Sequence, residues 1–130
     1  TEALILLGST PFGVGNAENN VITGNAIGNT VLGGAGNDTL DGAAGLDILW
    51  GQAGGDTFVF KRGTQTDIVG DFNVGQDKLH ISDYGFATVG AAKAAMTQVG
   101  VDIVFNLGGG DLVILQAVGI NTLTSAEFVL

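Results

Sequence analysis

Between residues 15 and 59 the chain repeats one pattern of polar and apolar positions every nine residues. Each unit begins with glycine, carries a short side chain with an oxygen atom at its sixth position, and carries a large apolar side chain at its eighth. One such unit cannot bury its apolar side chain alone, whereas stacked units form a continuous core. The pattern therefore predicts short strands centred on the apolar positions, which are Ile22, Val31, Leu40, Leu49 and Phe58.

The spacing also predicts how the units are arranged. If each strand is followed by a turn to the opposite side, two units complete one coil of 18 residues, and two parallel sheets face each other across the inward side chains. Turns on one side then come from units 18 residues apart. The sixth-position residue Asp38 is therefore expected beside Asp56. In the same way Asn29 is expected beside Asp47, and Asn20 beside Asp38.

These stacked side chains suit a calcium ion. Neighbouring carboxylates repel each other unless a cation lies between them. Calcium takes oxygen ligands, and glycine-rich turns let several backbone carbonyls converge on one ion. Clusters of Gly, Asn and Asp are also ordinary turn residues, so a single unit would indicate only a turn. Three consecutive units that keep both the apolar and the oxygen position favour calcium sites.

After residue 59 the period of nine ends, and short apolar runs alternate with turns, which predicts further strands. Residues 86–100 have helix-forming residues in their middle, which predicts one short helix. Residues 101–119 contain two apolar runs joined by residues 108–111, which predicts a hairpin that caps the open end of the stack, with Asp111 in its turn. We therefore predict an all-β fold with an N-terminal rung or cap (1–14), the repeats (15–59) and a capping region (60–130).

The composition limits the possible functions. The 130 residues suffice for one domain. The formal net charge of −9, with only four lysine and arginine residues, argues against binding to nucleic acid or to anionic lipid. The absence of cysteine excludes disulfides and thiolate metal sites. No apolar run approaches the ~18 residues of a membrane span.

Residues 33–41, GGAGNDTLD, resemble the calcium-binding nonapeptide of RTX (haemolysin-type) proteins, G-G-x-G-x-D-x-U-x, at every defined position. The resemblance implies a right-handed parallel β-roll that binds several calcium ions, about two to four. It implies that Asp38 with Asp56 forms the first site. Asn29 with Asp47 would form the second and Asn20 with Asp38 the third. Turn carbonyls would complete these sites, and they would come from Gly24, Ala26, Gly33, Ala35, Gly36, Gly42, Ala44, Gly51, Ala53 and Gly54.

Residues 56–83 resemble the segment that follows the last repeat in serralysin-type proteases and in the repeat modules of alginate epimerases. By this resemblance Asp67, Asp71 and Asp77 could build a further calcium site that closes the roll. The alternative is that they are ordinary turn and surface carboxylates. His80 is the only histidine, and without a nucleophile and a base beside it we expect no catalytic role.

The last four residues, Glu127, Phe128, Val129 and Leu130, resemble the terminal signal of RTX proteins that leave Gram-negative cells by type I secretion. Together with the repeats, this resemblance implies a secreted module with the type I secretion machinery as its partner. The chain would be exported unfolded and would fold outside the cell on binding calcium.

Two other functions remain open. Like the repeat modules of alginate epimerases, the chain could bind an extracellular polysaccharide, and Trp50 is the one indole that could stack on a sugar. An enzyme is the other option, and the absence of an initial methionine suggests a fragment or processed piece of a longer chain. The 130 residues themselves contain no catalytic motif, so we expect any catalysis in a domain upstream of this one.

Overall fold

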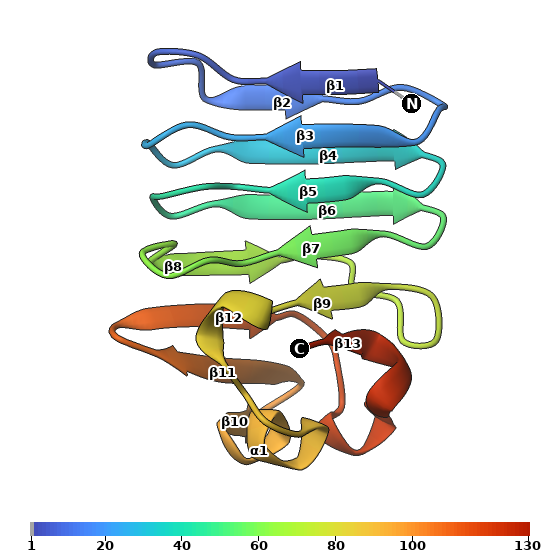
Figure 1. Ribbon diagram of the computed structural model, residues 1–130. Helices are drawn as coiled ribbons and strands as arrows, with labels where there is room; N and C mark the ends of the chain where they lie inside the picture. Colours follow the sequence, from blue (N-terminus) through green and yellow to red (C-terminus); the bar gives the residue numbers. More distant parts are fainter. Residues whose placement is uncertain (1) are drawn as a thin grey trace.

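A computed structural model describes residues 2–130 and shows a roll made of two β-sheets (Figure 1). The first sheet contains six strands, in the order β1 (Glu2–Ile5), β3 (Asn20–Thr23), β5 (Thr39–Asp41), β7 (Thr57–Val59), β9 (Lys78–His80) and β13 (Phe128–Val129). The second sheet contains seven, in the order β10 (Met96–Val99), β11 (Asp102–Gly108), β12 (Asp111–Leu115), β8 (Thr66–Val69), β6 (Ile48–Ala53), β4 (Thr30–Ala35) and β2 (Phe12–Val14). Consecutive strands alternate between the sheets from β1 to β9, so the chain coils.

The register of the strands follows the nine-residue period. Val21 pairs with Thr39 and Thr39 with Thr57, each 18 residues apart, and all these strands run parallel. After β7 the spacing lengthens: Thr57 pairs with Lys78, and Ile48 pairs with Ile68. The predicted parallel roll of two units per coil is confirmed.

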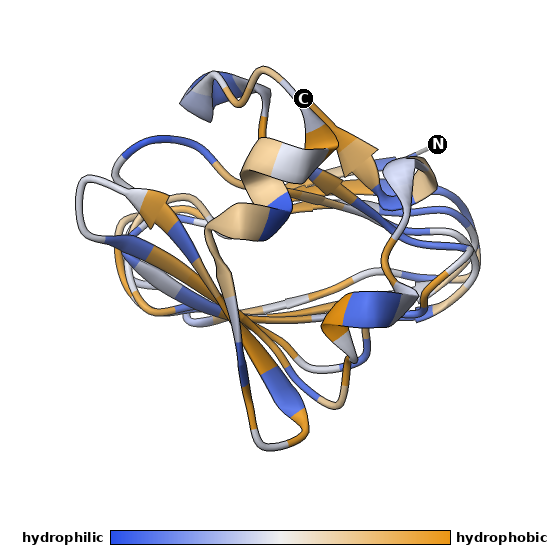
Figure 2. Cartoon of the chain, turned by 90° about the horizontal axis from the view of Figure 1, so that it is seen from below, coloured by the Kyte–Doolittle hydropathy of each residue, from blue (hydrophilic) through white to orange (hydrophobic). Residues whose placement is uncertain are grey.

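The core lies between the two sheets. All five eighth-position side chains, from Ile22 to Phe58, have no exposed surface, and Val69 and Leu79 continue the two rows. Successive side chains of a strand point to opposite faces, so the residues on either side of each apolar position face outward. Viewed along the stack (Figure 2), the two sheets lie on opposite sides of this interior and are joined by turns at both ends.

The C-terminal part extends both sheets. Strand β12 pairs in parallel with β8, and β11 and β10 follow in antiparallel order. The predicted hairpin over 101–119 is therefore present, and its strand β12 lengthens the second sheet. Strand β13 pairs with β9 and lengthens the first sheet.

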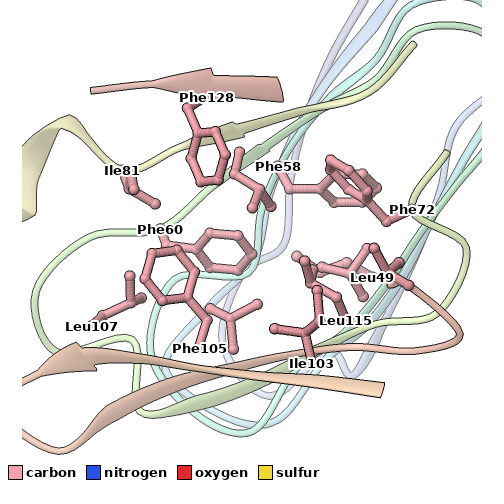
Figure 3. Packing of buried hydrophobic residues seen from close by; sticks show 14 of the residues in the cluster. Leu49, Phe58, Phe60, Phe72, Ile81, Ile103, Phe105, Leu107, Leu115 and Phe128 are labelled. Carbon is pink, nitrogen blue, oxygen red and sulfur yellow. The ribbon is translucent and has the colours of Figure 1, made fainter. Parts of the chain in front are cut away.

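The predicted short helix is α1 (Val89–Ala94), which begins at Thr88, whose side-chain oxygen accepts a hydrogen bond from the backbone of Ala91. Three short 3-10 helices lie at Ser82–Tyr84, Ile120–Thr122 and Ser125–Glu127. At this end the interior is aromatic: Phe60, Phe72, Phe105 and Phe128 point toward one another between the sheets (Figure 3). No helix among residues 2–130 is long and apolar enough to cross a membrane.

Candidate calcium sites

The sixth-position side chains form two ladders, one on each side of the roll. In the first, the backbone N–H of Asn20 donates to Asp38 Oδ1 at 2.7 Å, and that of Asp38 donates to Asp56 Oδ1 at 2.9 Å. In the second, the backbone N–H of Asn29 donates to Asp47 Oδ1 at 2.7 Å. The neighbours expected from the 18-residue spacing are therefore in direct contact, and each ladder uses one oxygen per carboxylate.

The other carboxylate oxygen is unsatisfied in three places. Oδ2 of Asp38, Asp47 and Asp56 is buried and has no hydrogen-bond donor. These side chains are at most 1% exposed, so water cannot solvate the charge. A buried charged oxygen without a partner is strongly destabilising, and native proteins pair such groups or bind a cation to them. Carboxylate and carbonyl oxygens in glycine-rich turns are the donor set that suits calcium.

The electrostatics of the ladders agree with this. Burial raises the pKa of Asp56 to about 6, although the hydrogen bond from the backbone of Asp38 acts to lower it. Burial also raises the pKa of Asp38 and of Asp47. In each case the charged form is penalised because it has left water without gaining a positive partner. A divalent cation would reverse the effect.

In the last three units, the first glycine lies against the unsatisfied oxygen. A Cβ atom at Gly33 would lie 2.5 Å from Asp38 Oδ2 and 2.7 Å from the carbonyl oxygen of Gly51. At Gly42 it would meet Asp47 Oδ2, and at Gly51 it would meet Asp56 Oδ2. A carboxylate oxygen therefore occupies the space of a side chain at all three glycines, and at Gly33 a carbonyl oxygen converges on the same point.

The backbone at the second position of these turns keeps a positive φ even where the residue is not glycine. Ala43 and Gln52 replace the second glycine of the motif, and both adopt left-handed conformations, with φ of 66° and 71°. Non-glycine residues rarely adopt such values, which cost of order 1 kcal/mol or more. The units 42–50 and 51–59, which lack the second glycine, therefore retain the turn geometry of the motif at the expense of backbone strain.

The first two units are different. Asn20 Oδ1 accepts from the backbone of Asn16 at 2.9 Å, and its Nδ2 donates to Asn16 Oδ1 at 3.0 Å. Asn29 makes the same two contacts with Asn25, at 2.8 and 2.9 Å. Asn20 lies beside Asp38 and Asn29 beside Asp47, as predicted. Their amides are nevertheless satisfied within their own unit and leave no unpaired oxygen for a cation.

Asp67, Asp71 and Asp77 do not come together as the single site considered from the sequence. Asp67 accepts from the backbone of Asp47 at 3.1 Å and extends the second ladder. Asp77 accepts from the backbone of Asp56 at 2.9 Å and extends the first, on the other side of the roll. Asp71 accepts from the backbone of Gly51 and Gln52. Within residues 2–130 no cluster of three or more acidic, histidine or cysteine side chains could hold a metal. Calcium here would need carbonyl ligands as well.

Asp111 has a role that the sequence did not reveal. It is buried and accepts from the backbone N–H groups of Gly63 at 2.8 Å and Gln65 at 3.0 Å. Its Oδ2 also lies 2.7 Å from the hydroxyl of Tyr84. Burial would raise the pKa of Asp111, but the hydrogen bond from Tyr84 and the two backbone donors lower it overall. Asp111 thus fixes the 63–65 turn to β12 rather than forming the hairpin turn. The three glycines before Asp111 indicated a turn in the sequence and did not indicate this contact.

The remaining candidate residues are spread over the surface and the C-terminal end. Glu127 is buried and accepts from the backbone of Thr124 at 3.0 Å and of Gly75 at 3.2 Å, while residues 128–129 form β13. Trp50 is 37% exposed, and its ring lies over Gly70, where a Cβ atom would come within 2.6 Å of it. Nε2 of His80 lies 2.9 Å from the hydroxyl oxygen of Ser82.

Comparison with known proteins gives four similarities: a repeat family, a related sequence and two solved structures. Residues 24–58 match the RTX calcium-binding nonapeptide repeat (4 copies). The chain is 41% identical over 127 residues to the endo-1,3-1,4-beta-glycanase EglC of Rhizobium meliloti (strain 1021), which aligns with 98% of this chain and 25% of EglC. The solution structure of the AlgE6R3 subunit of the Azotobacter vinelandii mannuronan C5-epimerase matches 95% of this chain and 80% of that one, with a TM-score of 0.72 and 28% identity. The extracellular lipase LipA of Serratia marcescens matches 88% of this chain with a TM-score of 0.60 and 28% identity.

The chain spans about a quarter of EglC and a fifth of LipA, whereas it covers most of the epimerase subunit. What it resembles as a whole is therefore a repeat module. The matched segment includes the three aspartates with unsatisfied oxygens and the glycines that face them. Residues 24–58 therefore contain RTX calcium-binding nonapeptide repeats, and the chain as a whole is a parallel β-roll that resembles a repeat module of a larger protein.

Proposed function

We propose that this chain is the calcium-dependent folding module of a longer, secreted protein. The observation that carries the proposal is the set of three buried carboxylate oxygens without a donor, at Asp38, Asp47 and Asp56. They make the calcium-free roll unfavourable at neutral pH, because each charge is removed from water without compensation. Calcium bound between the turns would remove this penalty and couple binding to folding. Sites of this kind in extracellular modules have dissociation constants of about 10⁻⁴ to 10⁻³ M.

The proposed ligands are those three carboxylates together with turn carbonyls such as that of Gly51, which faces the same point beside Gly33 as Asp38 Oδ2. We leave Asn20 and Asn29 out of the ligand set because their amides are hydrogen-bonded to Asn16 and Asn25. The third unit, 33–41, contributes Asp38, the fourth contributes Asp47 and the fifth contributes Asp56.

A calcium titration followed by far-ultraviolet circular dichroism tests this function. The chain is first freed of metal on a chelating resin, and magnesium serves as the ion control. We expect β-structure to form cooperatively with calcium and not with magnesium, since magnesium resists the loss of its water ligands. The triple variant Asp38→Asn, Asp47→Asn, Asp56→Asn should lose the response. Asp102→Asn, outside the ladders, should keep it. Full folding without metal at neutral pH would refute the proposal.

Export by the type I route is the second part of the proposal. The C-terminal residues 127–130 resemble the signal of this route, and in the folded chain Glu127 is buried and residues 128–129 lie in a sheet. A transporter could recognise them only in the unfolded chain, which the low calcium of the cytosol would maintain. Fusing the chain to a reporter in a Gram-negative host with a type I transporter tests this. Deletion of residues 127–130 should abolish export; unchanged export would contradict it.

Glycan binding is a second candidate function, supported by the outer face of the second sheet. Ile48, Ile68 and Ile114 form one row across three neighbouring strands, and the exposed Trp50 lies next to it over Gly70. Parallel sheets are normally covered on both faces, and a flat aromatic ring is a platform for a sugar. The relative EglC is a β-1,3-1,4-glycanase, which makes that glycan the first probe.

Affinity electrophoresis through gels containing the mixed-linkage β-glucan, with calcium present, tests this candidate. We expect retardation that Trp50→Ala removes. Val101→Ala, an exposed apolar residue in the turn between β10 and β11, is the matched control. Equal mobility of the wild-type chain with and without glycan would remove this function and leave the folding function standing.

A further inference from the structure

The N-terminal end of the roll presents two free strand edges. Strand β1 is the last strand of the first sheet and β2 is the last strand of the second, and no part of the chain that the structure describes lies beyond them (Figure 1). In β1 the backbone N–H groups of Glu2 and Leu6 donate to the neighbouring chain at β3. Backbone groups alternate in direction along a strand, so those of Ala3 and Ile5 point to the free edge.

Strand β2 has the same arrangement. The backbone N–H of Gly15 donates to β4, and the carbonyl oxygen of Pro11 accepts from β4. The backbone groups of Phe12 and Val14 therefore point to the free edge of the second sheet. Unpaired edges of this kind readily pair with another chain, and proteins usually protect them with charged residues or proline. The free-edge residues of both strands are neither charged nor proline.

This end is also apolar and almost uncharged. Ile5 and Phe12 are 63% and 53% exposed, and Leu7, in the turn between β1 and β2, is 74% exposed. In the next coil, threonines occupy the positions that pair with Ile5 and Phe12. Glu2 is the only charged side chain among residues 2–14, although the chain carries a formal net charge of −9. Such an end suits a partner that is held by apolar contacts and backbone hydrogen bonds rather than by opposite charge.

The opposite edge of the second sheet is covered by the chain itself. This edge is strand β10, which contains Gln98. The side chain of Gln98 donates to the carbonyl oxygen of Val118 at 3.1 Å and accepts from the backbone N–H of Ile120 at 2.8 Å. The chain therefore protects β10 and leaves β2 open.

We propose that the N-terminal end binds a second copy of this chain, so that β1 pairs with β1 and β2 with β2 across a two-fold axis. A two-fold axis perpendicular to the sheets reverses the strands, so the pairing at the junction is antiparallel, and the same surface is used by both copies. This inference goes beyond the proposed function, because it depends on the fold and not on what binds the turns.

In the first sheet, the axis would pass beside Leu4. Ala3 would then lie opposite Ile5 of the second copy, and since both have free backbone groups, each such pair would exchange two hydrogen bonds. The side chain of Leu4 is in register with Ile22 and packs against the core. The two copies of Leu4 would therefore close the apolar interior at the junction.

In the second sheet, the axis would pass beside Gly13, which lies nine residues after Leu4 and holds the same place in the repeat. One axis therefore serves both sheets. Phe12 would lie opposite Val14 of the second copy, an aromatic and β-branched pair of the kind that stabilises antiparallel strands.

The charges at this end do not oppose the contact. With the axis beside Leu4, each Glu2 would lie opposite Leu6 of the second copy, so the two Glu2 residues are about 13 Å apart along the strands. The Debye length is about 8 Å at physiological ionic strength, and their repulsion is therefore largely screened. An acidic chain can thus approach another copy of itself at this end.

Sedimentation velocity of the full 130-residue chain, with calcium present and over a wide range of protein concentrations, tests the proposal. We expect a monomer that becomes a dimer as the concentration rises. The double variant Ile5→Thr, Phe12→Thr carries the residue type of the next coil at both edges. It should weaken dimerisation about 10-fold or more, since each cross-strand pair occurs twice. Val99→Thr, at an exposed valine of the edge strand β10, is the matched control and should dimerise like the wild type.

Oxidative cross-linking tests the register. The chain contains no cysteine, so Leu4→Cys introduces a single thiol. Opposite residues of a non-hydrogen-bonded antiparallel pair have Cα atoms about 4.5 Å apart, which is within reach of a disulfide. We expect Leu4→Cys to form a cross-linked dimer on mild oxidation. Val21→Cys, on the inner strand β3, is 41% exposed as valine and should cross-link far less under the same conditions.

Each outcome decides the proposal. A folded wild-type chain that remains monomeric at every concentration refutes it. Dimerisation that Ile5→Thr, Phe12→Thr does not weaken, without cross-linking of Leu4→Cys, assigns the contact to another surface and also refutes it. Circular dichroism shows whether each variant is folded, and if Leu4→Cys is not, the threonine variant still decides. A chain that folds without calcium would contradict the proposed function and leave this test unchanged, because the dimer requires only the folded roll.

Discussion

Removing calcium should reverse the pH dependence of stability. In the metal-free roll the ladder carboxylates have raised pKa values because they are buried, and Asp56 is raised from 3.8 to about 6. A carboxyl whose folded-state pKa lies above its unfolded value stabilises the fold fully below the unfolded pKa, and this stabilisation is lost as the pH rises through the folded value. Without calcium, stability should therefore fall between about pH 4 and pH 7.

The size of the effect follows from the shift. One pKa unit corresponds to about 1.4 kcal/mol, so Asp56 alone contributes about 3 kcal/mol over this range. Asp38, Asp47, Asp67 and Asp77 are shifted in the same direction, mainly by burial. A few kcal/mol is a large part of the ~5–15 kcal/mol that stabilises a domain, so the metal-free chain should be largely unfolded at neutral pH.

Two carboxyls act in the opposite direction. Burial would raise the pKa values of Asp111 and Glu127, but hydrogen bonds from neighbouring donors lower both. Their contribution is present above the unfolded pKa values of about 4 and is lost as the pH falls further. The metal-free roll should therefore be most stable near about pH 5, where the ladders are largely protonated and this pair is still ionised.

Urea unfolding followed by circular dichroism, at about pH 5 and about pH 8, measures these slopes with and without millimolar calcium. With calcium the slope should have the opposite sign, because ion binding requires ionised carboxylates and releases protons. Asp56→Asn should reduce the metal-free loss of stability by up to about 3 kcal/mol, whereas Asp102→Asn should not change it. Equal slopes with and without calcium would refute this account of the ladders.

Three further predictions concern single features of the roll. Gly33→Ala should weaken calcium binding about 10-fold or more, measured by dialysis, because its Cβ would displace Asp38 Oδ2; an unchanged affinity would contradict the convergence of oxygens there. Tyr84→Phe removes a buried hydroxyl and should lower the urea-unfolding free energy by about 1 kcal/mol equally with and without calcium. Asn29→Asp should create one additional calcium site, counted by equilibrium dialysis, because it replaces the amide nitrogen that donates to Asn25 Oδ1 with an unpaired carboxylate oxygen; an unchanged number of bound ions would contradict this.

The repeats could be predicted from the sequence because local spacing alone determines them. The glycine, oxygen and apolar positions each recur every nine residues, and once the coil closes in 18 residues the partners of Asp38 and Leu40 follow. Strand positions, the two sheets and the contacts within the ladders all came from that one period. The C-terminal hairpin and helix could be predicted from their composition, but the strands with which the hairpin pairs could not.

The parts that could not be predicted depend on contacts between segments outside the period. Asp67 and Asp77 are close in the sequence, but the turns of 60–65 and 70–77 lie on opposite sides of the roll, so these two aspartates belong to different ladders. Asp111 meets the 63–65 turn across 46–48 residues, and no local pattern indicates such a contact. Sequence proximity therefore gave the wrong grouping once the nine-residue period had ended.

One position of the repeat thus satisfies a buried polar group in three ways. In the first two units an asparagine at the sixth position pairs with the asparagine at the second, so Asn20 and Asn16 exchange hydrogen bonds and need no ion. In the last three units the second position is glycine, alanine or glutamine in a left-handed conformation, and the aspartate retains an unpaired oxygen. Beyond the repeats, Asp77 takes a backbone donor from its own loop. Within the repeats, asparagine at the sixth position is therefore satisfied by the protein, whereas aspartate keeps an unpaired oxygen that a cation would satisfy, which would limit the proposed calcium sites to the last three units.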